Sequence, residues 1–302
     1  MANCYWIGTL GTENWYDNDG AGNSPWSSSP GGSTSGTNPV DGDSVYFDIN
    51  SLTAPAAGPS APVALTLLET AGFTPAFTFD TNVNIAAAGY VDIRQTSVFT
   101  GNLGAGATAT LDEAGVFAGT SAGSNTISFN GSSSNSAGSF GGTGNAISFA
   151  GTSVNNAPFT VAGSVAFSGS PVNNAVITAT TCTMLGYVTG TGGLTGPVAM
   201  GDAGYNQMSG IITGDVTLTS SLSCYNYGPI TGNVTVTGSG ARNLGTVTGN
   251  ITLVAGGTNT GSCTGTLTAP YSAGAGAWGA WGTLVLTGMP YGINGTGILG
   301  MV

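Results

Sequence analysis

One short segment near the N-terminus carries oxygen-bearing side chains at the spacing of a metal-binding loop. Asp17, Asp19 and Asn23 lie around Gly20 in the run Asp-Asn-Asp-Gly-Ala-Gly-Asn. Alternating oxygen ligands around a glycine turn suit a hard cation such as Ca²⁺, although the bidentate glutamate that closes an EF-hand loop is missing from its place. An Asx-rich turn that caps its own backbone explains the same residues. The segment therefore predicts either a Ca²⁺ site or an Asx-rich turn, and Ca²⁺ is the sole cofactor that the sequence suggests.

The residue types that most enzymes use for acid–base and covalent catalysis are scarce. The chain has no histidine and no lysine, which removes the commonest general base and the Schiff-base nucleophile. A glycosidase needs two carboxylates that face one substrate, but in a strand the neighbours Asp112 and Glu113 would point to opposite faces. Carboxylates from different repeats could still converge, as in the lyases and hydrolases that β-helices host. We predict a protein that is not an enzyme, with a β-helix polysaccharide depolymerase as an alternative.

The spacing of the cysteines bears on the redox compartment. Cys182, Cys224 and Cys263 are widely separated, and Cys4 lies far from them in the sequence. We assume that the chain winds in coils of about 18 residues stacked about 4.8 Å apart. Cys224 is then more than two coils from both Cys182 and Cys263, which is beyond disulfide reach. We therefore predict four free thiols, which favours folding in a reducing cytoplasm over secretion.

Threonines recur in Thr-x-Thr pairs that stacking could align into flat ranks. The pairs are Thr217/Thr219, Thr235/Thr237 and Thr266/Thr268, and Thr252/Val254 interrupts the series. Such ranks resemble those of ice-binding β-helices, which makes an ice-binding protein a further alternative. Threonine is also an ordinary exposed strand residue, and that explains the same pattern.

Composition favours an ordered, sheet-rich chain that does not bind nucleic acid. Of 302 residues 53 are glycine, yet 40% are hydrophobic and only 5% are charged, unlike a disordered chain. Lysine is absent and threonine and asparagine are abundant, which disfavours long helices. The net charge is −11, and the only basic residues are Arg94 and Arg242. Two arginines cannot neutralise a phosphate backbone. No apolar run of about 18 residues is present, so we expect no membrane insertion, and the N-terminal residues lack the pattern of a signal peptide.

A repeated seven-residue pattern predicts the fold. It begins at Leu194, Ile212, Ile230 and Val247 and reads Ile-Thr-Gly-Asn-Val-Thr-Val in its clearest copy. Strand centres aligned on this pattern are Ile127, Ile147, Val165, Cys182, Val198, Val216, Val234, Ile251 and Leu267. Alternating apolar residues indicate half-buried strands, and stacked repeats bury what one repeat cannot. We predict an all-β fold, a β-solenoid (parallel β-helix) with about 18 residues per coil; an antiparallel sandwich is the alternative.

The two ends differ from the repeats. Residues 1–60 are rich in tryptophan and glycine and are predicted to form a cap or attachment region, because the first coil of a solenoid needs a covered edge. Residues 61–270 are the predicted solenoid, and the apolar, aromatic residues 271–302 a second cap or a contact segment. The predicted interaction residues are the tryptophans of the two ends: Trp6, Trp15, Trp26, Trp278 and Trp281.

The N-terminal region carries a resemblance. Residues 6–15 (Trp-Ile-Gly-Thr-Leu-Gly-Thr-Glu-Asn-Trp), followed by residues 39–48 (Pro-Val-Asp-Gly-Asp-Ser-Val-Tyr-Phe-Asp), resemble an opening of bacteriophage structural proteins. A related opening precedes the β-helices of autotransporter passenger domains, but Thr9 replaces the usual second glycine. The resemblance extends no further than this opening. It implies a non-enzymatic structural or adhesive protein, a fibre, spike or capsid decoration assembled in a host cytoplasm onto a virion surface. It also implies partners: other virion proteins, further copies in a homo-oligomer, and a host surface glycan. A prokaryotic surface adhesin or filament subunit, located on the cell surface, is the alternative.

Overall fold

The computed structural model describes residues 2–8, 13–16, 24–33, 38–51, 53–69, 75–121, 123–254, 256–270 and, for the backbone alone, 281–287. These residues form strands and turns and contain no helix, so none of them forms a helix able to span a membrane. The fold is a parallel β-solenoid with about 18 residues between successive coils, as predicted. The chain divides into two compact units, Met1–Gly163 and Ser164–Val302.

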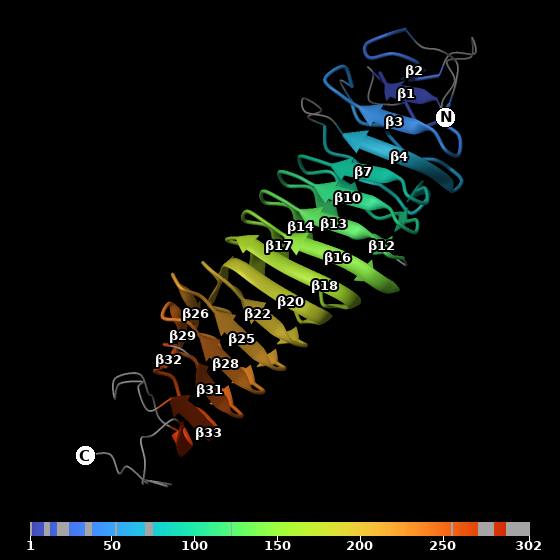
Figure 1. Ribbon diagram of the computed structural model, residues 1–302. Coiled ribbons are helices and arrows are strands. Elements are labelled where there is room, and N and C mark those ends of the chain that lie inside the picture. The colour runs from blue at the N-terminus through green and yellow to red at the C-terminus, as the bar shows by residue number, and fades with distance from the viewer. Residues whose placement is uncertain are drawn as a thin grey trace. The chain divides into compact units, whose positions relative to one another are not determined.

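Three columns of parallel strands build the first unit, and successive coils follow one another in Figure 1 from blue to green. The first column contains β1 (Asn3–Trp6), β3 (Ser44–Phe47), β4 (Val63–Glu69), β7 (Tyr90–Ile93), β10 (Thr108–Leu111), β13 (Thr126–Phe129) and β16 (Thr143–Phe149). The second contains β5 (Thr78–Phe79), β8 (Val98–Phe99), β11 (Val116–Phe117), β14 (Ser134–Asn135) and β17 (Val154–Asn155). The third continues from β4 through β6 (Val83–Ile85), β9 (Asn102–Leu103), β12 (Thr120–Ser121) and β15 (Ser139–Phe140).

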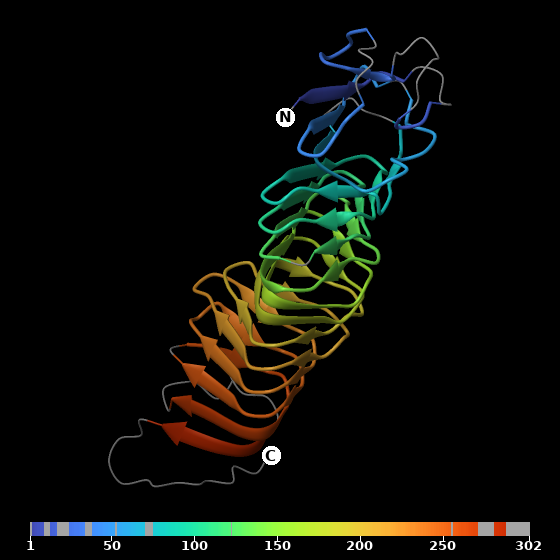
Figure 2. The same cartoon turned by 90° about the vertical axis from the view of Figure 1, so that its right-hand side faces the viewer.

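The second unit repeats this plan, with the turns of its coils visible in Figure 2. Its first column runs from β20 (Ile177–Val188) through β21 (Leu194–Thr195), β24 (Ile212–Thr213), β27 (Ile230–Thr231) and β30 (Val247–Thr248) to β33 (Cys263–Pro270). The second contains β22 (Val198–Met200), β25 (Val216–Thr219), β28 (Val234–Thr237), β31 (Ile251–Val254) and β34 (Trp281–Thr287). The third contains β23 (Tyr205–Asn206), β26 (Cys224–Asn226), β29 (Ala241–Asn243) and β32 (Thr258–Asn259). Between the two sets of columns in the sequence lie β18 (Phe159–Gly169) and β19 (Val172–Asn173).

The strand registers agree with the predicted alignment of strand centres. Ile127 pairs with Ile147 in the first unit. In the second unit the paired series is Cys182, Val198, Val216, Val234, Ile251 and Leu267. Each of these residues is buried, and outward-facing residues alternate with them. These pairings are all parallel, so the antiparallel sandwich is excluded for the strands that they join.

The glycine of the Thr-Gly repeat is required by the stacking of the corners. Gly214, Gly232 and Gly249 have φ of +143°, +149° and +148°, a region that residues with a Cβ rarely adopt. A Cβ on Gly232 would lie 2.2 Å from the carbonyl oxygen of Gly214 in the preceding coil. The repeat therefore encodes a corner at which one coil lies directly against the backbone of the next.

The N-terminal residues form the first coil of the first unit. β1 pairs in parallel with β3, and its other edge pairs antiparallel with β2 (Trp26–Ser27). This antiparallel pair covers an edge that would otherwise expose unpaired backbone groups. The strand order β1–β3–β4 joins the strands Asn3–Trp6 and Ser44–Phe47 in register to the coils that follow. β34 extends the second column near the C-terminus, and the rest of residues 271–302 lies outside the described residues.

Candidate functional site

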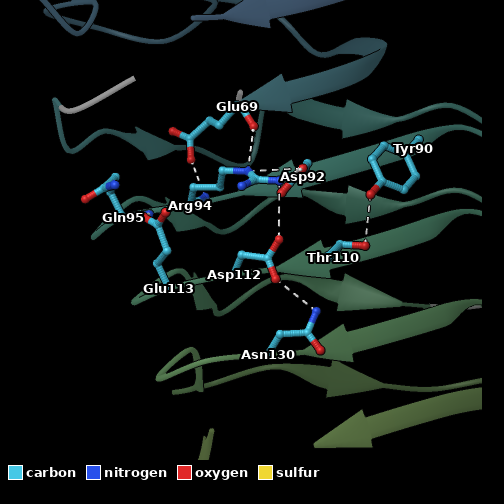
Figure 3. A network of polar contacts seen from close by, with 9 residues as sticks. All are labelled: Glu69, Tyr90, Asp92, Arg94, Gln95, Thr110, Asp112, Glu113 and Asn130. Carbon is cyan, nitrogen blue, oxygen red and sulfur yellow. Dashed lines mark hydrogen bonds and ion pairs between the residues drawn. The ribbon is translucent and has the colours of Figure 1, made fainter. Parts of the chain in front are cut away.

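Charged side chains converge at one corner of the first unit, where the strands of the first column end (Figure 3). Glu69 is the last residue of β4, Asp92 lies in β7, and Arg94 and Asp112 directly follow β7 and β10. Parallel pairing places Asp92 beside Leu68 of the preceding coil and Thr110 of the next. Residues 69, 92, 94 and 112 are thereby brought together from three successive coils.

Arg94 is the centre of this network. Its Nη2 lies 3.0 Å from Asp92 Oδ2 and 3.4 Å from Asp112 Oδ2. Its Nε donates to the backbone oxygen of Glu69 at 3.1 Å, and its backbone N–H donates to Glu69 Oε2. Asn130, one coil further on, donates from Nδ2 to Asp112 Oδ1 at 2.9 Å. One guanidinium thus joins the carboxylates of neighbouring coils.

Burial dominates the electrostatics of the network. Glu69 is fully buried, and desolvation raises the pKa of its carboxyl to about 8, against the opposing effects of the Ser97 hydroxyl and Arg94. Burial also raises the pKa of Asp92, although Arg94 opposes the shift. The hydrogen bonds and charge of Asp92 in turn raise the pKa of Arg94. Glu69 is therefore protonated at neutral pH, while Arg94 stays charged.

The geometry of the network favours a structural tie over acid–base catalysis. A general acid must reach the proton acceptor on a substrate, but Glu69 is fully buried and Asp92 is only 8% exposed. Arg94 contacts both Asp92 and Asp112, so its charge compensates the two carboxylates that a glycosidase would need free. Asp112 and Glu113 lie in a turn after β10, not in the strand that the sequence suggested.

Two turns beside the network have an unusual backbone. Gln95 and Glu113 adopt φ of +53° and +56°, and the corresponding turns of the next two coils place Gly131 and Gly151 at +58° and +64°. This left-handed region is unfavourable for residues with a Cβ. The backbone N–H of Gln95 donates to Glu113 Oε2 at 3.3 Å. Non-glycine residues thus occupy this turn position beside the charged network, where later coils use glycine.

The structure corrects the assignment of three predicted interaction residues. Trp6, Trp15 and Trp26 are fully buried, and they pack with one another and with Phe47 at ring-centroid distances of 4.8 to 6.2 Å. Trp6 Nε1 donates to the backbone oxygen of Thr53, and Trp26 Nε1 to that of Trp15. Burial removes these large, mostly apolar side chains from water, and the indole N–H groups of Trp6 and Trp26 keep hydrogen-bond acceptors. These side chains form core, so they offer no surface to a partner.

The other predicted site residues fall partly outside the described structure. Asp17, Asp19, Asn23 and Trp278 lie outside the described residues, and so does the side chain of Trp281, the first residue of β34. Within the described ranges, no group of three or more Cys, Asp or Glu side chains could hold a metal ion. The Ca²⁺ site at residues 17–23 and the contacts of Trp278 and Trp281 remain predictions.

The structure agrees with the prediction of four free thiols. All four cysteines are free and buried. Burial raises the pKa of the Cys4 thiol to about 11 and the pKa values of the Cys182 and Cys224 thiols to about 12. Thiols with such raised pKa values carry almost no thiolate at neutral pH and are chemically inert.

The threonine ranks are more continuous than the sequence indicated. Thr217, Thr235, Thr252 and Thr268 pair in succession across four coils. A second rank on the same strands ends where Thr237 pairs with Val254. A third rank, in the first column, consists of Thr195, Thr213, Thr231 and Thr248. These side chains are exposed or half-buried, so they form an ordered hydroxyl surface on the second unit.

Two further ladders escaped sequence reasoning. Asn206, Asn226, Asn243 and Asn259 stack as a buried column, and Tyr187, Tyr205, Tyr225 and Arg242 stack on the outside of the same strands. The signal in the sequence is a dipeptide, Tyr-Asn at residues 205–206 and 225–226 and Arg-Asn at 242–243.

Comparison of this sequence and structure with family models, curated proteins and solved structures gives no match.

Proposed function

We propose that this chain is a non-enzymatic structural and adhesive protein, a bacteriophage virion component such as a fibre, spike or capsid decoration. The observation that carries the proposal is the stacking of identical residue types on one another in successive coils. Within the second unit, three columns of strands keep their register across successive coils, with valine, threonine and asparagine repeatedly paired with themselves. Such a scaffold repeats similar outward residues over several successive coils and supplies a regular surface.

The buried ladders support this proposal because they hold each coil to the next in a fixed register. In the second unit a buried asparagine donates to the next asparagine at 2.6 to 2.7 Å. In the first unit Phe99 stacks on Phe117, and Phe129 on Phe149, with centroids 5.8 and 4.7 Å apart. Fully satisfied polar columns rigidify a core, and aromatic pairs add about 0.5–1.5 kcal/mol beyond the area they bury.

The proposed partners are further copies of this chain, other virion proteins and a host surface glycan. We place the protein on a virion surface, with a prokaryotic cell surface as the alternative location for an adhesin or filament subunit. Trp278 and Trp281 are the proposed contact residues for assembly. With Trp6, Trp15 and Trp26 in the core, the C-terminal region is the part of the chain to test for self-association.

Negative-stain electron microscopy beside light scattering tests the structural proposal. We expect defined oligomers of the purified chain, and weaker association of a Trp278→Ser/Trp281→Ser double variant with unchanged circular dichroism. Tyr90→Ala, a substitution of an aromatic residue far from the C-terminus in sequence, is the matched control. A monodisperse monomer that joins no larger assembly would contradict the proposal.

The ordered hydroxyl surface favours ice binding as a second candidate function. Threonines repeat about every 4.8 Å across the coils and about 6.8 Å along each strand, from Thr217 to Thr219 and from Thr235 to Thr237. Thermal hysteresis of the purified chain, compared with that of a Thr235→Lys variant, tests this candidate. No hysteresis in the unchanged chain would exclude it.

A further inference from the structure

An outward-facing row of aromatic side chains crosses the coils of the second unit. Tyr187, Tyr205 and Tyr225 are paired neighbours in β20, β23 and β26, and Arg242 in β29 continues the row. Tyr187 is 39% exposed, Tyr205 and Tyr225 are half-buried and Arg242 is exposed. At about 4.8 Å per coil the row is about 14 Å long, the length of a short oligosaccharide.

The rings contact one another and so hold a defined surface. The Tyr187 and Tyr205 centroids are 5.8 Å apart, and the Tyr205 and Tyr225 centroids are 5.0 Å apart in an edge-to-face contact. Tyr227, 45% exposed, packs against Tyr225 at 6.2 Å. The Tyr187 hydroxyl donates to Gln207 Oε1. Tyrosine has few rotatable bonds, so such a surface loses little entropy when a ligand covers it.

Arg242 gives the row a charge preference. It is the only basic residue of the second unit, and its guanidinium lies 5.7 Å from the centre of the Tyr225 ring. Among the described residues it forms no ion pair, and residues 271–302 contain no Asp or Glu. An exposed guanidinium matches the planar geometry of a carboxylate and can bind it through two hydrogen bonds. Charge complementarity therefore points to an anionic ligand at this end.

We propose that the row formed by Tyr187, Tyr205, Tyr225, Tyr227 and Arg242 binds a carboxylated oligosaccharide. Sugar rings would lie against the tyrosine rings, whose faces attract the C–H groups of a pyranose, while the carboxylate pairs with Arg242. Gln207 adds hydrogen-bonding capacity for hydroxyls. This inference rests on the adhesive part of the proposed function and names its ligand class and its surface.

A nucleic acid fits the same surface less well. Its affinity comes mainly from the neutralisation of many phosphates, whereas this surface offers one cation and the chain carries a net charge of −11. A single carboxylate beside several apolar sugar faces needs only one guanidinium. Binding of a single-stranded oligonucleotide more tightly than any saccharide would overturn the proposal.

Calorimetric titration of the full chain with three carboxylated probes tests the inference: oligogalacturonate, alginate oligomers and oligosialic acid. We expect at least one to bind, with affinity that falls as salt screens the charge. Tyr225→Ala and Tyr205→Ala should each weaken binding by about tenfold or more, as for aromatic residues at the centre of an interface. Thr235→Ala, on an exposed rank of the same unit, is the matched control and should bind normally.

The methyl ester of the bound saccharide separates the two halves of the surface. Arg242→Gln should weaken binding of the acid by about tenfold and leave binding of the ester unchanged. No binding of any of the three acids overturns the inference, and so does binding that the tyrosine variants leave intact. Assembly is measured separately, so a chain that binds saccharide but stays a lone monomer would refute the structural proposal and keep this site.

Discussion

The side-chain amide of Asn226 donates to Oδ1 of Asn243, one coil further on, at 2.7 Å, and both residues are fully buried. The same Asn226 Nδ2 donates to the backbone oxygen of Gly228 at 2.8 Å. Asn226 Oδ1 accepts from Asn206, and Asn243 donates to Asn259. Each amide thus uses the next coil and its own turn as partners, so a strongly polar side chain is accommodated in the core.

Removal of one asparagine from this column should be strongly destabilising. Asn226→Ala leaves the Asn206 amide, the Asn243 oxygen and the Gly228 oxygen without their present partner. We expect a loss of at least about 3 kcal/mol in the free energy of unfolding, because three buried polar groups lose a partner and each unsatisfied group costs about 1–3 kcal/mol. Urea unfolding followed by circular dichroism measures it.

Asn233, which directly precedes β28, provides the matched control. It bonds to Asp215 and Asn250 in a similar ladder, but on the exposed surface. Water replaces the lost partners there, so Asn233→Ala should cost less than about 1 kcal/mol. Equal losses for the two variants would show that the buried ladder is not a source of stability.

The left-handed turns beside Arg94 predict an opposite pair of effects. Glu113→Gly should raise the free energy of unfolding by up to about 1 kcal/mol, because glycine accepts φ of +56° without strain. Gly131→Ala, at the corresponding turn one coil on, should lower it by about 1 kcal/mol, since φ is +58° and a Cβ would lie 3.1 Å from the Glu113 backbone nitrogen. Thermal unfolding of both variants measures the changes, and a destabilised Glu113→Gly would show that its side-chain contacts outweigh the strain.

Much of the fold could be predicted from the sequence because the period of the repeat fixes which residues stack. The pairing of Val198 with Val216 and of Val216 with Val234 follows directly from the constant spacing of the repeated pattern. Asparagine is common in turns, so the sequence alone does not indicate that Asn226 and Asn243 end strands and face inward.

The charged network and the tyrosine row could not be predicted, for different physical reasons. Glu69 and Asp92 are separated by more than the regular spacing of about 18 residues per coil. Their convergence on Arg94 therefore depends on a longer connection that the repeat pattern does not predict. Tyr205 and Tyr225 do follow the period, but an outward tyrosine resembles any exposed strand residue until the stacking of the coils is known. The burial of Trp6 and Trp26 likewise could not be predicted, because it depends on the antiparallel pairing of β1 with β2.

The free thiols predict a clear chemical behaviour. In the native protein, Cys4, Cys182, Cys224 and Cys263 should react very slowly with a thiol reagent such as Ellman's, because they are buried and their pKa values are raised. In guanidinium chloride without reductant, all four should react at once. Fewer than four reactive thiols in the unfolded chain would reveal a disulfide.

The buried Glu69 carboxyl predicts a pH dependence of stability with a definite sign. Its pKa rises from 4.5 in the unfolded chain to about 8 in the folded one. Between these two values the folded state keeps a proton that the unfolded state has lost, so stability falls as pH rises. This contribution is fully present below about pH 4.5 and is lost as pH passes about 8.

Glu69→Gln should remove this decline, since glutamine stays neutral and can still accept from the Arg94 backbone N–H. The difference in unfolding free energy between the variant and the unchanged protein should grow with pH and reach on the order of 5 kcal/mol near pH 9. Denaturant unfolding at pH 4, 6, 8 and 9 measures it, with the exposed Glu113→Gln as control. A difference that stays constant with pH would mean that Glu69 is ionised in the folded protein, with Arg94 compensating its charge.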